Sequence, residues 1–308
     1  MNWKTLLKTH GYLIADGAMG TQLAARGLPA GVLPEAWNLE RPDAVADVTR
    51  AYVEAGAQVV LTNTLGGARW KLARAGLADH TAEVNRAATE AARHGAGQRA
   101  AVFVSVGPTG ELVAPLGTRR EQEFVDVFAE QIDACAEAGA DGICIETMTA
   151  LEEALAAVRA ARQAAPDLPV VASMTYDRGL KVVATVMGVT PEQAARALEA
   201  AGADIIGSNC GDGIQGHVEV ARLLRPATAR PVWIKSNAGR PEWVDGQTVF
   251  RQTPEDMARH VEALLAAGAN IIGGCCGTTP AHIRAIAAAA EAARDTALQA
   301  GRDVLAAL

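Results

Sequence analysis

Three cysteines stand at the ends of short apolar runs, at positions where their thiols can meet around one metal ion. Cys275 and Cys276 are adjacent in the run Ile271-Ile-Gly-Gly-Cys-Cys-Gly-Thr278, and Cys210 closes the run Ile205-Ile-Gly-Ser-Asn-Cys210. Neighbouring side chains of a strand point to opposite faces, so both members of the pair can face one ion only where the chain turns. The flanking glycines permit that turn. Zn²⁺ with three protein ligands and an open fourth position is a catalytic arrangement rather than a structural one.

The alternative for a cysteine is burial as a small hydrophobic residue, which is common for free thiols. That interpretation suits Cys135 and Cys144, which lie in a helical and a strand-like segment. A disulfide between Cys275 and Cys276 would be strained, and disulfides are rare in cytosolic proteins. Five cysteines without a framework of spacings suggest a reducing cytoplasm.

Composition narrows the class of protein. Half of the 308 residues are hydrophobic, which is enough for a large core. The net charge of −7 argues against nucleic acid and anionic membranes as partners. We expect no transmembrane helix and no signal peptide, because no uncharged apolar run is long enough for either. A cytoplasmic location is therefore expected.

A short Val/Ile-rich run, a polar or glycine-rich loop and an alanine-rich helical stretch recur eight times. The expected strands are Tyr12–Ala15, Gln58–Thr62, Ala101–Val106, Gly142–Glu146, Pro169–Thr175, Ile205–Ser208, Pro231–Lys235 and Asn270–Gly273. The expected helices, from their three- and four-residue spacing of apolar positions, are 43–55, 82–95, 121–138, 150–165, 191–201, 215–225, 254–267 and 280–295.

Eight strand–helix units of this size predict an α/β fold, a single (β/α)₈ TIM barrel domain over residues 1–308. A doubly wound open sheet is the alternative, but no GxGxxG motif follows the first strand, so a dinucleotide-binding version has little support. The loops 26–40 and 236–253 are longer than the others and are candidate lids.

The chemistry of such a barrel sits at the carboxyl ends of its strands. There the sixth strand ends at Cys210 and the eighth at the cysteine pair, while the seventh contributes Asn237, our candidate for a fourth, oxygen ligand. A metal-bound thiol is deprotonated at neutral pH, so an electron-rich three-thiolate zinc site predicts a thiol as substrate.

Two carboxylates, Asp16 and Glu146, stand at strand ends on the other side of the predicted mouth. Together they suit an ammonium group, as in an amino acid. The competing interpretations are a helix cap for Asp16 and an exposed ion pair for Glu146.

Several motifs together resemble the zinc-dependent homocysteine S-methyltransferases, over about residues 12–290. They are Asp16-Gly-Ala-Met-Gly-Thr21, Thr62-Asn-Thr64, Gly107-Pro-Thr-Gly-Glu111, Glu146-Thr147, Met174-Thr-Tyr-Asp177, Asn209-Cys210 and Gly273-Gly-Cys-Cys-Gly-Thr-Thr-Pro280. Within the family, Gly107-Pro-Thr-Gly-Glu-Leu112 and Ser236-Asn-Ala-Gly-Arg-Pro241 are most similar to the homocysteine-binding module of cobalamin-dependent methionine synthase.

The resemblance implies a (β/α)₈ barrel with Zn²⁺ on Cys210, Cys275 and Cys276, which are thus the catalytic residues, and homocysteine as methyl acceptor. The substrate-binding residues that it implies are Asp16, Gly17, Thr64, Glu146 and Asn209.

The methyl donor is expected to be a methylcorrinoid, free or carried by a protein. Betaine or S-methylmethionine is the alternative, and betaine needs an aromatic cage for its quaternary ammonium. The aromatic candidates for such a cage are Trp37, Tyr176 and Trp243.

Two other classes stay open. One is a metal-free barrel that binds a phosphorylated or pterin substrate near Gly273 and Gly274. The other is a non-catalytic zinc- or thiol-binding subunit of a methyl-transfer complex.

Overall fold

The eight expected strands are present and form one closed parallel barrel. The computed structural model describes residues 3–179, 182–244 and 247–307. The barrel strands are β1 (Leu13–Ile14), β2 (Val59–Leu61), β3 (Ala101–Val106), β4 (Gly142–Met148), β5 (Val170–Met174), β8 (Ile205–Cys210), β9 (Val232–Ser236) and β12 (Ile271–Gly274). They pair in the order β1-β12-β9-β8-β5-β4-β3-β2, and a parallel bridge from Ala15 to Val59 joins the two ends. The closure rules out the open sheet.

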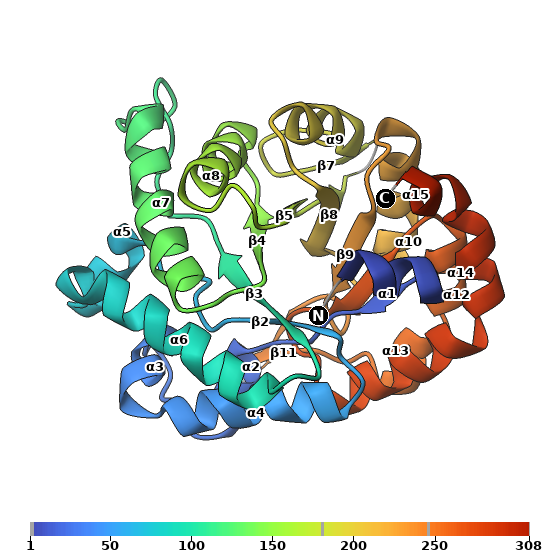
Figure 1. Ribbon diagram of the computed structural model, residues 1–308, viewed down its shortest axis with the longest axis horizontal. Coiled ribbons are helices and arrows are strands. Elements are labelled where there is room, and N and C mark those ends of the chain that lie inside the picture. Colours follow the sequence, from blue (N-terminus) through green and yellow to red (C-terminus); the bar gives the residue numbers. More distant parts are fainter. Residues whose placement is uncertain (1–2, 180–181, 245–246, 308) are drawn as a thin grey trace.

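Helices between consecutive strands surround the barrel (Figure 1). They are α4 (Pro42–Glu54), α6 (Thr81–Ala96), α7 (Glu121–Glu137), α8 (Leu151–Ala164), α9 (Pro191–Ala200), α10 (Ile214–Leu224), α11 (Pro254–Ala258), α12 (Val261–Ala266) and α13 (Pro280–Ala292). Their bounds agree with the predicted ranges within a few residues, except that the helix expected at 254–267 is interrupted between α11 and α12. Threonine caps before an N1 proline explain several of the starts: the Thr190 and Thr253 hydroxyls accept backbone N–H bonds of their helices.

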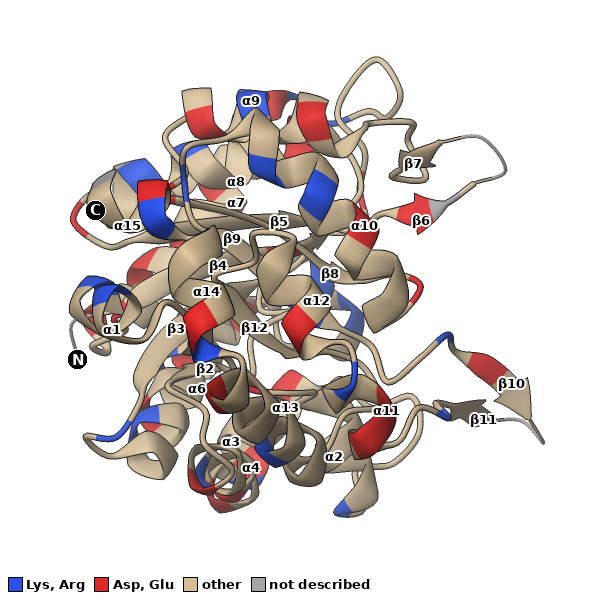
Figure 2. Ribbon diagram, turned by 90° about the vertical axis from the view of Figure 1, so that its right-hand side faces the viewer, with Lys and Arg blue, Asp and Glu red and all other residues tan. Residues whose placement is uncertain are grey.

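Some elements had no clear signal in the sequence because they are short. At the mouth are α2 (Gly20–Ala25), α3 (Trp37–Glu40), α5 (Arg69–Leu72) and the hairpins β6/β7 (Asp177–Arg178, Val183–Ala184) and β10/β11 (Glu242–Val244, Gln247–Val249). At the opposite end lie α1 (Trp3–His10), α14 (Arg294–Ala300) and α15 (Arg302–Ala307). Figure 2 shows both hairpins projecting on the side away from the N-terminus, β6/β7 above and β10/β11 below. The second predicted lid therefore carries β10/β11.

The inside of the barrel changes character along its axis. Its lower part, toward the amino ends of the strands, is an apolar cluster that Leu7 of α1 closes. Its upper part, toward the carboxyl ends, is the mouth. Three strands change from apolar to polar within two residues: Phe103 to Ser105, Cys144 to Glu146, and Trp233 to Lys235. Because every second side chain of a strand points inward, the fold brings these polar groups to the mouth. None of the helices in the described part of the chain has the length and apolarity to cross a bilayer.

Candidate active site

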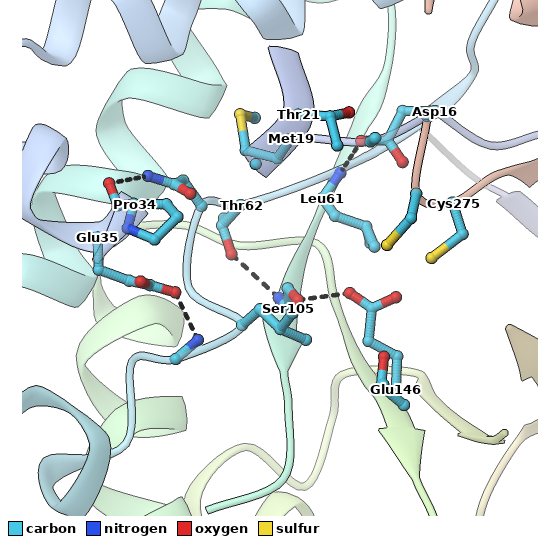
Figure 3. A pocket seen from close by; sticks show the side chains of 18 of the residues that line it. Asp16, Met19, Thr21, Pro34, Glu35, Leu61, Thr62, Ser105, Glu146 and Cys275 are labelled. Atoms are coloured by element: carbon cyan, nitrogen blue, oxygen red, sulfur yellow. Dashed lines mark hydrogen bonds between the residues drawn. The ribbon is translucent and has the colours of Figure 1, made fainter. Parts of the chain in front are cut away.

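A cavity of about 430 Å³ opens at the carboxyl ends of the strands (Figure 3). This volume suits one or two small molecules. Sulfur, carboxylate and ammonium groups share its wall, contributed by Asp16, Gly17, Ser105, Glu146, Thr147, Cys210, Lys235, Cys275 and Cys276. The predicted gathering of cysteines and carboxylates at one mouth is thus observed.

The three sulfur atoms of Cys210, Cys275 and Cys276 lie within 4.8 Å of one another, and those of Cys210 and Cys275 are 3.1 Å apart. A tetrahedral zinc with Zn–S bonds of about 2.3 Å separates its sulfurs by about 3.8 Å, so the cluster has the right size. Backbone bonds hold it in place: the Cys275 N–H donates to the Ser236 carbonyl at 2.7 Å. Cys210 adopts a positive φ of 63°, which turns its thiol toward the pair.

The pKa values of the cluster thiols also shift in opposite directions. Hydrogen bonds from Cys210 and Cys275 lower the pKa of Cys276 to about 3, and the same contacts raise the pKa of Cys210 well above its ordinary value. One thiolate is favoured at the expense of the others, so three thiolates together require a cation. By contrast, Cys135 and Cys144 are buried in the core, where burial raises the pKa of both thiols. Those two cysteines are the small hydrophobic residues that were expected.

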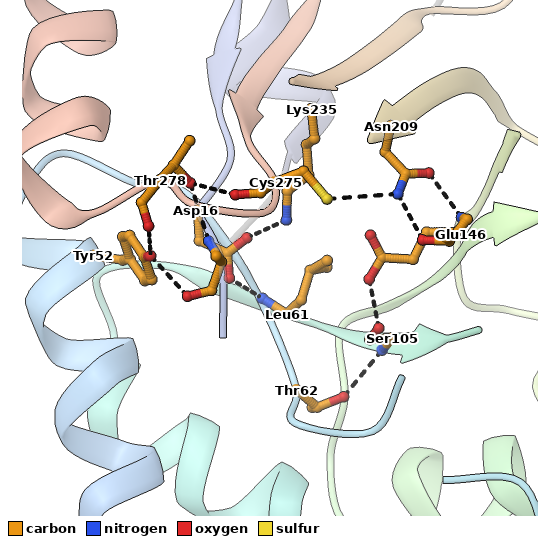
Figure 4. Close-up of polar contacts among 12 residues, drawn as sticks. Asp16, Tyr52, Leu61, Thr62, Ser105, Glu146, Asn209, Lys235, Cys275 and Thr278 are labelled. Atoms are coloured by element: carbon orange, nitrogen blue, oxygen red, sulfur yellow. Dashed lines mark hydrogen bonds and ion pairs between the residues drawn. The ribbon is translucent and has the colours of Figure 1, made fainter. Parts of the chain in front are cut away.

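Asp16 has a partner that the sequence analysis did not assign. The Lys235 ammonium donates to Asp16 Oδ1 at 2.5 Å, and both side chains are only 3% exposed. Burial alone would lower the pKa of Lys235, but the charges of Asp16 and Glu146 outweigh it and raise that pKa. The other oxygen, Oδ2, accepts the Leu61 N–H at 2.7 Å. Asp16 is therefore neither a helix cap nor a carboxylate awaiting a cation (Figure 4).

Two further buried carboxylates line the cavity, Glu35 and Glu146. Glu35 accepts the Gly66 N–H with Oε1, and its Oε2 has no hydrogen-bond partner among the described residues. Glu146 is the one of the two that stands at the end of a barrel strand, β4. Its Oε1 accepts the Ser105 hydroxyl at 2.6 Å. Glu146 is buried on the cavity wall, not paired on the surface, and burial raises its pKa to about 7. A cationic group in the cavity would restore the lost solvation and favour the ionised form.

Asn237 directly follows Ser236, the residue of β9 that pairs with Cys210 of β8, and it has a buried oxygen without a partner in the described chain. Its amide nitrogen donates to the Gly211 carbonyl at 3.1 Å, while Oδ1 is buried without a partner. A buried acceptor left unpaired is costly, so Oδ1 of Asn237 is open to a further partner. The group of possible metal ligands found in the described chain is Cys210, Cys275 and Cys276. The residues present thus fit a metal ion, and the donor set of three sulfurs fits zinc.

Comparison with known proteins agrees with this geometry. The family model described as homocysteine S-methyltransferase matches residues 13–290. This chain belongs to the homocysteine S-methyltransferase family. In this family the cysteine triad is typical of the zinc site, so the expected cofactor is confirmed at this level.

Individual relatives refine the comparison. The chain is 34% identical over 297 residues to methionine synthase of Mycobacterium tuberculosis, covering 90% of this chain and 24% of that protein. It is 29% identical over 299 residues to betaine–homocysteine S-methyltransferase 1 of Mus musculus, covering 89% and 71% respectively. The metallated form of the homocysteine methyltransferase MmuM from Escherichia coli superposes with a TM-score of 0.77 at 25% identity, over 92% of this chain and 98% of that one. The chain thus spans about a quarter of the length of the methionine synthase it matches.

Two predicted substrate-binding residues of this family member lie behind the cavity wall. Thr64 is fully buried, and its hydroxyl bonds Thr62 and the Ser105 carbonyl. Asn209 is also fully buried, and neither residue lines the cavity. Thr64 and Asn209 thus lie in the layer behind the cavity wall, and their role in substrate binding stays a prediction. Gly17, in contrast, does line the cavity, and a side chain there would collide with Thr278 and Tyr52.

The alternative phosphate site near Gly273 and Gly274 is not supported, because neither glycine lines the cavity. A Cβ at Gly274 would lie 2.3 Å from Thr278 Oγ1, and one at Gly273 would lie 2.8 Å from the Asp16 carbonyl. These glycines serve close packing of the chain behind the cysteine pair, so the metal-free alternative loses its physical basis.

Sequence reasoning missed His217 and the partner role of Lys235. The ring of His217 bridges Ser208 Oγ at 3.1 Å and Ser236 Oγ at 2.9 Å, which ties β8 to β9 beneath the sulfurs. Burial lowers the pKa of His217 to about 4, so the neutral ring can donate to one hydroxyl and accept from the other. Lys235 did carry a signal, because a charged residue at an inward strand position is unusual. His217 carried none, since its partners are set by helix packing.

Proposed function

We propose that this chain catalyses transfer of a methyl group to the thiol of homocysteine, with methionine as product and a methylcorrinoid as donor. One observation carries the proposal. A cluster of three sulfurs and the buried carboxylate of Glu146 face the same small cavity. A ligand that fits both has a thiol at one end and an ammonium group at the other.

In this proposal Cys210, Cys275 and Cys276 hold Zn²⁺, with Asn237 Oδ1 as the fourth donor before substrate arrives. Bound zinc supplies a way to keep a thiol deprotonated at neutral pH. Glu146 binds the substrate ammonium and so aims its chain along the cavity. The thiol loses its proton, the sulfur attacks the methyl carbon, and the bond between methyl and donor breaks.

The rest of the wall completes the binding of an amino acid. Gly17 lines the cavity, and its backbone is our candidate contact for a substrate carboxylate. The neighbouring Lys235 adds positive charge, although its pair with Asp16 balances most of it. The homocysteine carboxylate is therefore placed near Gly17, away from Glu146, and Thr64 and Asn209 support the wall behind it.

A corrinoid donor is favoured over betaine by the composition of the cavity wall. No aromatic side chain lines the cavity among the described residues. Trp37 is buried with Arg41 stacked on its ring, Tyr176 borders a different, smaller pocket, and Trp243 is 76% exposed on β10. A quaternary ammonium would thus lack the ring faces that usually hold it.

The rim of the mouth also supports a large donor. Large hydrophobic side chains that are exposed in the described chain all belong to segments that follow the carboxyl ends of barrel strands. They are Val32, Leu65, Leu112, Leu116, Val182, Val186, Met187 and Trp243. Exposed apolar groups gathered around a site mark an interaction surface. We assign this rim to a corrinoid-carrying protein or domain.

Donor competition tests the proposal. Zinc-loaded protein and homocysteine are supplied in turn with methylcobalamin, betaine, S-methylmethionine and S-adenosylmethionine, and methionine is measured. We expect methionine only with methylcobalamin. Turnover with betaine alone at about 1 s⁻¹ or more, an ordinary enzymatic rate, would contradict the choice of donor. Absence of proton release when homocysteine binds would contradict the choice of acceptor, because a thiol that binds a metal gives up its proton.

A further inference from the structure

Asn209 makes a hydrogen-bond network that the proposed reaction does not yet use. Its Oδ1 accepts the Thr147 N–H at 2.8 Å and the Ser173 hydroxyl at 2.7 Å. A backbone N–H can only donate, so these contacts fix which end of the carboxamide is the oxygen. The NH₂ group must then point the other way.

The NH₂ group of Asn209 faces two of the three cluster sulfurs. Nδ2 donates to Thr147 Oγ1 at 2.8 Å and lies 3.6 Å from Cys210 Sγ. It also lies 3.8 Å from Cys275 Sγ (Figure 4). With two N–H groups and three acceptors, one N–H serves the threonine and the other is shared by the sulfurs. No hydrogen bond reaches Cys276 from this carboxamide in the described chain.

Backbone strain gathers around the same side chain. Thr147 and Cys210 have φ values of 64° and 63°, and they are the non-glycine residues with positive φ in the described chain. Both contact Asn209, one through two hydrogen bonds and one through its sulfur. Such conformations cost about 1–3 kcal/mol each and persist where the surrounding structure enforces them, often at functional sites. The pairing register of β4 and β5 also shifts between Ile145 and Met148, so β4 is distorted where Thr147 bonds the Asn209 carboxamide.

The chemistry of the proposed reaction gives this contact a purpose. Three protein thiolates and the substrate sulfur would lie together at the metal site, close to one reactive methyl group, and any of the four could attack its carbon while the donor leaves. An N–H bond to a thiolate withdraws negative charge from the sulfur and weakens it as a nucleophile. Asn209 lies behind the wall, so a sulfur that binds in the cavity receives no such bond.

We propose that Asn209 is a positioning residue that directs methylation to the substrate: its N–H groups quench the nucleophilicity of Cys210 and Cys275 and leave the incoming sulfur the most reactive. The proposal rests on S-methyl transfer as the function of the cavity. It further implies that Cys276, which the carboxamide does not reach, is the most easily methylated of the three.

Methylation of the protein itself tests this. Zinc-loaded wild type, Asn209→Asp and Asn209→Leu are exposed to methyl iodide, which gives its methyl group to a sulfur while iodide leaves. Mass spectrometry then follows each cysteine, and metal content is measured alongside. Asn209→Asp keeps the oxygen that Thr147 and Ser173 bind and removes the N–H groups, whereas Asn209→Leu removes both. We expect Cys210 and Cys275 to react about 10-fold faster in both variants, as for loss of one hydrogen bond to a charged group.

Asn85→Asp is the matched control, because Asn85 is equally buried and its amide donates two 2.8 Å bonds far from the cluster sulfurs. That variant should lose stability with no change in cysteine methylation. A second readout uses cobalt-loaded protein, where the sulfur-to-metal charge-transfer bands should shift in the Asn209 variants alone.

Unchanged methylation rates or unchanged cobalt bands would overturn the proposal. So would variants that bind no metal at all, because Asn209 would then serve metal affinity instead of the choice of sulfur. The test does not use homocysteine, so it can succeed even if every donor assay of the proposed function fails.

Discussion

In the lower half of the barrel interior the inward side chains are large and apolar, whereas two residues further along the same strands they are thiols, carboxylates and an ammonium group. Phe103 gives way to Ser105 and Trp233 to Lys235. Both halves are buried, so burial does not distinguish them. What differs is how each side chain is satisfied, by packing below and by specific polar partners above.

This difference separates the origin of stability from the origin of chemistry. The lower cluster gains free energy by removing apolar area from water, and it needs no particular partner. The upper groups cost free energy unless each is paired, since buried charges are unfavourable alone. Lys235 and Asp16 satisfy each other, while the sulfurs and Glu146 face the cavity and Asn237 Oδ1 has no hydrogen-bond partner in the described chain. Substitutions in the polar upper part of the barrel should therefore remove function. Substitutions in the apolar lower part should reduce the stability of the fold.

The largest effect is expected from the sulfurs. Cys210→Ala, Cys275→Ala or Cys276→Ala should each reduce bound zinc from about one per chain to near zero and abolish turnover, because the site has only three fixed ligands. The melting temperature of the metal-free protein should stay within a few degrees of the wild type. Elemental analysis and calorimetry measure both.

Cys144→Ala is the control for the sulfur variants, because Cys144 is a fully buried cysteine on the interior face of β4. It should retain zinc and lose some stability. A single variant at the cluster that kept full zinc and activity would remove that cysteine from the site.

The lower layer should respond in the opposite way. Phe103→Ala should destabilise the fold by about 3–5 kcal/mol, since it leaves a cavity in the lower cluster. The ring sits against Gly142, where a Cβ would lie 2.6 Å from it, so nothing nearby can fill the space without movement. Urea unfolding measures the loss. The fraction that stays folded should still bind zinc stoichiometrically; loss of zinc there would mean that the two halves are coupled.

The barrel and the sulfur cluster could be predicted from sequence because their signals are local. Buried strands read as continuous apolar runs, and the helices between them have long periodic faces with threonine caps and glycine ends. Once eight such units imply a barrel, residues at strand ends must share one mouth. That reasoning alone brought Cys210 next to Cys275, 65 positions away, and the structure agrees.

The remaining features depend on contacts that sequence does not encode locally. Asp16 pairs with Lys235 across 219 positions, and no pattern says which of two carboxylates receives the lysine. The strained Thr147 is not a glycine, so its positive φ has no signature. The hairpins β6/β7 and β10/β11 are too short for a periodic signal, although the length of 236–253 did mark one of the two loops.

The ion pair in the upper layer is expected to have an intermediate effect. Lys235→Met should cost about 3 kcal/mol, because it leaves Asp16 buried without a cation. Asp16→Asn combined with Lys235→Met should recover a large part of the loss, since both charges are then removed. Urea unfolding of the two single variants and the double variant measures the coupling. If the losses in free energy of unfolding of the two single variants added up in the double variant, Asp16 and Lys235 would not be coupled. The buried polar groups of the mouth would then depend less on mutual pairing than we argue.

The smallest effect is a pH dependence of binding that isolates Glu146. Burial raises the pKa of Glu146 to about 7, so below that pH the carboxyl group is neutral and cannot pair with an ammonium group. Affinity for an amino acid should therefore rise as pH increases through about 7 and level off above it. Below the pKa the affinity should fall by up to about 10-fold per pH unit, the limit for one titrating group.

L-Methionine is the right ligand for this measurement, because homocysteine would add the titration of its own thiol. Calorimetric titration of methionine between pH 5.5 and 8.5, values chosen to span about one and a half units on each side of the pKa, should give the rising curve for the wild type. Glu146→Gln should bind weakly at every pH with a flat profile, since its amide does not ionise. Asp16→Asn should keep the wild-type shape, because Asp16 is occupied by Lys235. A pH dependence that disappeared in Asp16→Asn and persisted in Glu146→Gln would contradict this assignment. The ion pair of Asp16 with Lys235 would then open when substrate binds, and Asp16 rather than Glu146 would be the carboxylate that receives the ammonium group.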